Sequence, residues 1–219
     1  MNKEWSELNK TMQVQLRNEN TFDEGIMSLL QLRHMLFEEV CNLKKDLTRD
    51  QFNEMPFMNV NGFHNKTIIY SLWHVFRIED IVIHTLIQHD KQIFFSKGYQ
   101  TKIKSSLITT GNELVKQEIV DFSRQLDLDS LYQYINDVKK STDDILKDFS
   151  YQDLKTKITS EDKENLVSLK VVSDCEEALW LIDYWCSKDI RGLIQMPLSR
   201  HWIMHIEACL RIQKRIYIK

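Results

Sequence analysis

The stretch IIYSLWHVFRIEDIVIHTLI, residues 68–87, decides the fold of this chain. On a helical wheel it is apolar nearly all round, a pattern typical of a helix buried inside a larger protein. We therefore expect a helix over about residues 67–89, with one polar strip along its length. The strip consists of Arg77, Asp80, His84 and Gln88. It predicts an exposed His84, whereas His74 lies off the strip, among apolar residues.

Helical spacing of apolar residues recurs on both sides of this stretch. We expect further helices at residues 4–17, 22–48, 112–125, 129–147, 176–190 and 198–217. With 5 Gly and 2 Pro in 219 residues, few turns are encoded, which favours long helices over many short strands. Ile-rich pieces such as IVIHTLI are similar to buried strands, but they lie inside longer helical patterns. The sequence therefore predicts an all-α fold with a single domain over residues 1–219.

Composition and charge exclude several classes of protein. The formal charge is −3, with 29 Lys+Arg against 32 Asp+Glu, so we expect no direct contact with nucleic acid. No apolar run approaches the length needed to cross a bilayer, so no membrane partner is expected. The first 15 residues lack the apolar core of a secretory signal, which predicts a cytoplasmic protein. The four cysteines show no CxxC spacing, and we interpret them as buried thiols.

Near the C-terminus, the segment HWIMH places His201 and His205 four residues apart. On a helix this spacing points both imidazoles the same way, about 40° apart around the axis. Both residues fall within the apolar stripe of the helix, where a polar group without a partner costs roughly 1–3 kcal/mol. A divalent metal ion would supply a shared partner, provided that a third group closes the site.

The alternative interpretation is that these two imidazoles are core side chains bonded to backbone or water. The inward placement of both rings, with His74 on another buried helix, gives the metal interpretation equal weight. The remaining histidines are interpreted as structural or solvent-facing: His34, His64, His84 and His89.

Arg33 and Glu79 each interrupt the apolar stripe of one of the first two long helices. An unpaired buried charge is expensive, whereas a paired one persists, so we predict a structural ion pair between them. Glu79 points to a different face of its helix from His74, and we do not expect it to contact the same metal.

The segments SLWHVFRIED, residues 71–80, and PLSRHWIMHIEACLRI, residues 197–212, resemble the DinB/YfiT-like family of helical-bundle metalloproteins. The matching elements are a His on the second long helix and an HxxxH on the last helix. The resemblance implies a four-helix bundle in the up-down-down-up arrangement. The chain departs from the shortest family members by extra material around residues 96–125 and 150–172, where we expect extra short helices. It also implies that His74, His201 and His205 bind a divalent ion, with water in the open coordination positions.

The resemblance further implies a homodimer and, for some members, thiol-transferase activity with low-molecular-weight thiols such as bacillithiol, mycothiol or glutathione. Three neutral ligands leave the charge of the ion intact, so a bound water is acidified toward a pKa of about 7. A thiol in the same position would be held as thiolate, a better nucleophile. Three imidazoles accept Zn, Ni or Fe alike, so the metal is not determined. No catalytic general base is evident.

Two hypotheses about function follow. The first is a metal-dependent thiol transferase or hydrolase that acts on a small molecule. The second is a non-catalytic metal-binding or interaction protein that retains the bundle. An open metal site at the floor of a cavity favours the first, and a closed coordination shell favours the second.

An aromatic cluster accompanies the histidines. Its members are Trp73, Trp180, Tyr184, Trp185 and Trp202. Such residues either line a ligand pocket beside the histidines or form part of the core, and the core is the more frequent role.

Overall fold

The structure is a computed structural model that describes residues 2–218, without the side chain of Glu177. These residues form helices joined by loops and contain no β-strand, which confirms the all-α prediction. The α-helices are α1 Lys3–Gln15, α2 Phe22–Asp46, α3 Arg49–Phe52, α4 Ile68–Asp80, α5 Ile93–Ser96, α6 Tyr99–Ile103, α7 Gln117–Gln125, α8 Leu128–Asp148, α9 Ser160–Ser168, α10 Glu176–Cys186, α11 Ile190–Gln195 and α12 His201–Tyr217.

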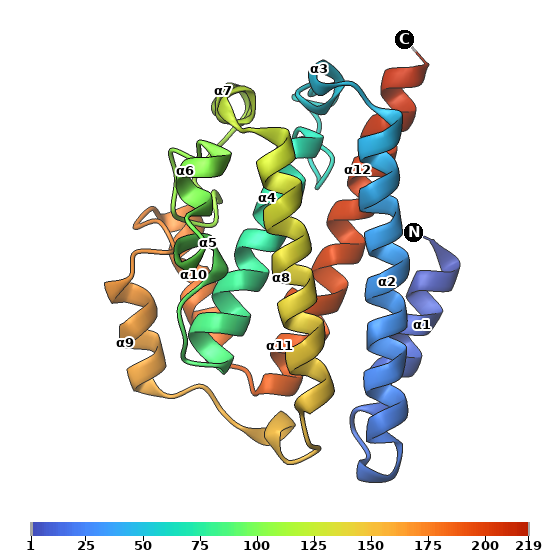
Figure 1. Cartoon of the computed structure of the whole chain (residues 1–219), viewed down its shortest axis with the longest axis vertical. Helices are drawn as coiled ribbons and strands as arrows, with labels where there is room; N and C mark the ends of the chain where they lie inside the picture. Colours follow the sequence, from blue (N-terminus) through green and yellow to red (C-terminus); the bar gives the residue numbers. More distant parts are fainter. Residues whose placement is uncertain (1, 219) are drawn as a thin grey trace.

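Four helices, α2, α4, α8 and α12, run alongside one another and enclose the core (Figure 1). α4 contacts both α8 and α12, and α2 contacts the same two helices. α1 packs against α2 (Figure 1). Every residue of α4 is buried, as its apolar sequence predicts. The rings of Phe76 on α4 and Trp202 on α12 meet at a centroid distance of 4.6 Å, which places the core between these helices.

The polar strip predicted for the central helix is mostly buried, and the expectation of an exposed His84 is wrong: its relative exposure is 5%. The chain that follows α4 folds back over this strip. Arg77 donates a hydrogen bond to the carbonyl oxygen of Ile108 at 2.8 Å, and Asp80 accepts one from the backbone N–H of Phe94 at 2.9 Å. The strip therefore binds a covering loop instead of water, which a helical wheel does not reveal.

Two π-helical turns interrupt the helices that carry the candidate ligands. The first, Ile81–Ile87, continues α4, and the second, Met196–Arg200, leads directly into α12 at His201. The helices predicted over residues 67–89 and 198–217 are therefore present but change pitch. Such turns are frequent at functional sites, because the extra residue re-aims the side chains beside it.

The predicted ion pair between Arg33 and Glu79 is confirmed. Arg33 Nη2 lies 2.8 Å from Glu79 Oε1, and both side chains are fully buried. Arg33 Nε also lies 2.7 Å from Asp143 Oδ1, and the indole N–H of Trp202 donates to Glu79 Oε2 at 2.7 Å. Burial alone would lower the pKa of Arg33, but the two carboxylates raise it, so the guanidinium stays charged. This network joins α2, α4, α8 and α12 behind the histidines.

The segments 96–125 and 150–172 hold short helices between irregular stretches. α6 and α7 belong to the first segment and α9 to the second. α6 packs on α8, α7 packs on α4, and α9 contacts α10, so these short helices flank the group formed by α2, α4, α8 and α12. None of the helices in residues 2–218 combines the length and apolarity that a bilayer crossing demands.

Candidate metal centre

The three predicted ligands converge. His74 lies on α4, while His201 and His205 lie on successive turns of α12, and all three are buried. Each offers one nitrogen atom, and these three atoms lie within 4.8 Å of one another. The ring centroids are 4.5–5.1 Å apart. Two ligand nitrogens that both lie 2.0–2.1 Å from one ion are at most about 4.2 Å apart, so small rotamer changes would suffice to bind it.

The loop before α7 fixes the orientation of His74. His74 Nδ1 lies 2.7 Å from the carbonyl oxygen of Thr110, which can only accept, so Nδ1 carries the proton and donates. The lone pair of Nε2 is then free to bind a metal ion. Metal-binding histidines almost always make such a bond through their other nitrogen. The ring of Tyr70 stacks on His74 at 5.7 Å and adds a second constraint.

The electrostatics of the centre keep all three imidazoles neutral. The pKa of His74 is lowered to about 4, mainly by burial; the bond to Thr110 raises it and the charge of nearby Lys66 lowers it. Burial lowers the pKa of His201 and His205 well below the ordinary value, and the neighbouring histidines add to this effect. Neutral imidazole is the form that binds a metal ion, so the donors are in the correct state at neutral pH.

Two ring nitrogens without a partner also support a metal ion at this site. The Nδ1 atoms of His201 and His205 are buried and have no hydrogen-bond partner within residues 2–218. Two such groups on adjacent turns would cost roughly 1–3 kcal/mol each if nothing bound there. The core alternative, in which backbone or water satisfies the imidazoles, finds support only at His74, which bonds to Thr110. A divalent ion is a ligand that would orient both α12 rings together.

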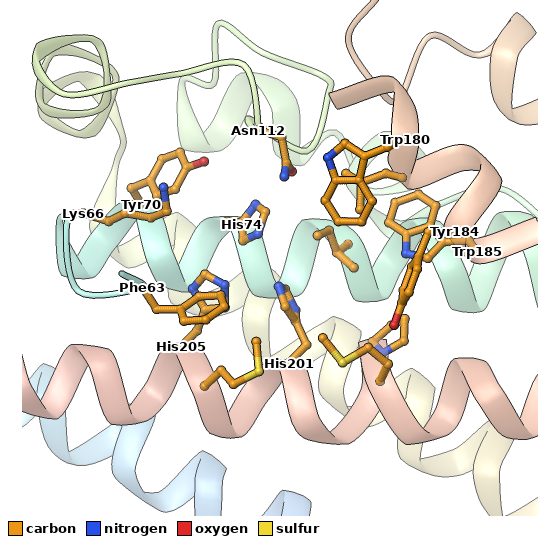
Figure 2. A pocket seen from close by; sticks show the side chains of 15 residues that line it. Phe63, Lys66, Tyr70, His74, Asn112, Trp180, Tyr184, Trp185, His201 and His205 are labelled. Carbon is orange, nitrogen blue, oxygen red and sulfur yellow. The ribbon is translucent and has the colours of Figure 1, made fainter. Parts of the chain in front are cut away.

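A cavity of about 360 Å³ opens directly at the three histidines (Figure 2). Its lining is mostly aromatic and aliphatic, from the loop before α4 and from α4, α10, the π-helical turn Met196–Arg200 and α12. The cavity lies at the lower end of the size range for small-molecule sites. The histidines therefore lie on the wall of an open space, not inside a closed shell of protein ligands.

The aromatic cluster predicted beside the histidines divides into two groups. Trp180, Tyr184 and Trp185 line the cavity, as Figure 2 shows. Trp73 and Trp202 are fully buried core residues and do not line it. The core interpretation is thus confirmed for two members of the cluster, while the other three line a cavity beside the histidines.

Loop residues that line the cavity were not predicted from the sequence, and three of them are polar groups or contact the histidines. Lys66 and Phe63 lie on the loop before α4, and Asn112 lies on the loop before α7. Phe63 packs edge-on against His205 with a centroid distance of 5.2 Å, and Asn112 Oδ1 is buried without a partner. Loop residues carry no periodicity, so no pattern could have placed them. The one sign in the sequence was the position of Lys66, directly before Thr67, the N-cap of the most buried helix.

The remaining histidines lie outside the centre. His84 uses both ring nitrogens in contacts with Asp90 and Ser141, at 2.6 and 3.2 Å, which agrees with a structural role. His34 and His89 are exposed, and His64 packs edge-on against Phe57. None of these four joins the cluster of potential ligands found among residues 2–218.

We expect Gly111→Ala to weaken metal binding about 10- to 100-fold, the usual effect of disturbing a group that orients a ligand. Gly111 has φ +77°, and a Cβ here would lie 2.6 Å from the ring of buried Trp73. The loop must shift, and the Thr110 carbonyl that holds His74 would shift with it. Gly98→Ala is the matched control, because Gly98 has φ +67° and nothing within 4 Å. Zinc titration against a chromogenic chelator measures both variants, and equal affinities would contradict the prediction.

Together, the buried neutral imidazoles, the unpartnered ring nitrogens and the adjoining cavity form an arrangement that could bind one divalent ion and a small molecule. Three protein ligands leave at least one coordination position for an incoming group. No protein-family model and no curated protein sequence matches this chain.

Proposed function

We propose that this protein is a divalent-metal-dependent enzyme of the DinB/YfiT-like type, with thiol-transferase or hydrolase chemistry at a centre of His74, His201 and His205. One observation carries the proposal: three neutral, buried imidazoles converge at the wall of a cavity large enough for a small molecule. In this proposal α2, α4, α8 and α12 form the four-helix bundle in the up-down-down-up arrangement, and the shorter helices are additions to it.

The ion is Zn, Ni or Fe, each of which three imidazoles accept. When bound, it would supply a Lewis acid that activates either water or a thiol at neutral pH. The residues of the chain would position the ion and shield it from bulk water. Thr110 orients His74, the apolar wall excludes bulk water, and the buried network behind α12 holds the helices in register.

The small-molecule partner in this proposal is a low-molecular-weight thiol or an ester-like substrate. The resemblance of residues 71–80 and 197–212 to the family also leads us to propose a cytoplasmic homodimer. These assignments go with the family proposal, and an assay of oligomeric state by light scattering tests the dimer separately.

A second candidate function is metal binding without catalysis. It is favoured by the absence of a carboxylate among the described residues that line the cavity, because a carboxylate is one of the usual general bases of hydrolysis. The two candidates differ in whether a thiol can reach the ion and react.

We expect Co²⁺-loaded protein to gain an intense near-ultraviolet sulfur-to-metal absorption band when a low-molecular-weight thiol such as glutathione is added. The band requires an open coordination position beside the cavity. Zn²⁺-loaded protein should then speed the reaction of the thiol with a chloronitroaromatic electrophile, or the hydrolysis of a nitrophenyl ester. Metal-free protein is the first control, and His34→Ala, which removes an exposed histidine, is the second.

The outcomes separate the two candidates. A thiol band with metal-dependent turnover supports the enzyme. Tight Co²⁺ binding with an unchanged spectrum in the presence of thiol, and no turnover, would contradict it and favour the non-catalytic protein.

A further inference from the structure

The cavity at the histidines has two chemically different ends. Lys66 and Tyr70 lie at one end, Trp180, Tyr184 and Trp185 at the other, and the histidines between them (Figure 2). Among the described residues that line it, Lys66 is the only Lys, Arg, Asp or Glu, and burial lowers the pKa of its ammonium group. A ligand that fills this cavity therefore meets a cation on one side and aromatic rings on the other.

Lys66 is half-buried, yet no ion pair is described for it within residues 2–218. Its ammonium lies 5.2 Å from the centroid of the Tyr70 ring, which supports a cation but does not neutralise it. The charge of Lys66 lowers the pKa of His74 and of His205, so the ammonium group lies within electrostatic reach of both histidines. A half-buried ammonium without a carboxylate is a ready partner for an anionic ligand group.

The opposite end offers apolar surface. The ring of Trp180 meets that of Tyr184 edge-on at 5.7 Å, and the indole of Trp185 is buried behind them. Leu181, Met196 and Pro197 add further apolar lining to the cavity. Aromatic and aliphatic side chains of this kind take up an apolar group by burying its surface.

We propose that this cavity binds a small monoanion: a carboxylate that pairs with Lys66, joined to an apolar or aromatic body that packs against Trp180, Tyr184 and Trp185. One lysine matches one negative charge, and a phosphate dianion would leave a charge without a partner in an apolar site. The inference rests on the proposed function for its biological meaning, since it names the substrate class of that centre. The carboxylate contact itself needs no metal.

The test compares phenylbutyrate with phenylbutyramide, which has nearly the same shape but no charge. Binding to the full-length, metal-free protein is followed by tryptophan fluorescence, because Trp180 and Trp185 line the cavity. We expect the acid to bind about tenfold or more tightly than the amide, the range of a charge-assisted hydrogen bond. In Lys66→Gln the ratio should fall to about one.

Lys116→Gln is the matched control. Lys116 borders a smaller neighbouring cavity that Lys66 also touches, but it does not line the cavity at the histidines. It should keep the preference for the acid. A ratio near one in the unaltered protein, a preference that survives Lys66→Gln, or no binding of the acid at about 1 mM would each overturn the proposal. Because the protein is metal-free, failure of the metal proposal would leave this result unchanged.

Discussion

Arg33→Met is expected to lower the free energy of unfolding by about 3–5 kcal/mol, the effect of breaking a buried ion pair from one side. The guanidinium is fully buried and bonds to Glu79, Asp143 and the carbonyl oxygen of Leu198. Its removal leaves the carboxylate of Glu79 buried with only the indole N–H of Trp202 as a donor. Urea denaturation at neutral pH measures the loss.

Two controls separate this buried network from ordinary surface charge. Lys140→Met breaks the exposed pair with Asp144 and should leave the urea denaturation midpoint almost unchanged. Arg33→Met combined with Glu79→Gln should recover part of the loss, because no unpaired charge is then left at the Glu79 position. An Arg33→Met variant within about 1 kcal/mol of the unaltered protein would contradict the role given to the network.

Much of the fold could be read from the sequence because long apolar periodicities dominate it. The burial of α4, the inward direction of His201 and His205, and the pairing of Arg33 with Glu79 all follow from helical phase. The positions of the apolar residues around the helix axis show which face is buried, and a charged side chain on that face needs a partner.

Other features depend on contacts that no local pattern encodes. Arg77, Asp80 and His84 form a polar strip that a loop covers, and no local pattern of residues predicts that cover. Likewise Thr110, which orients His74, lies in an irregular stretch 36 residues away. The 112–125 helix was expected to start at residue 112 but begins at Gln117, after the loop that carries Asn112 into the cavity.

His205→Ala is expected to weaken zinc binding by more than about 100-fold. Loss of a group that merely orients a ligand costs 10- to 100-fold, so loss of a ligand should cost more. His205 is 2% exposed, and its ring lies 4.9 Å from that of His74 and 4.5 Å from that of His201. Two imidazoles would then remain to bind the ion, His201 on α12 and His74 on α4. His34→Ala, which removes an exposed histidine on α2, should bind zinc as the unaltered protein does.

Competition with a chromogenic chelator, on protein purified without a metal column and stripped of metal, tests the convergence of the three imidazoles most directly. Circular dichroism of the metal-free variants verifies that each is folded. The account predicts about one tightly bound zinc per chain for the unaltered protein and for His34→Ala, and its loss in His205→Ala. Equal zinc content and affinity in all three proteins, or no tight binding in the unaltered chain, would contradict it.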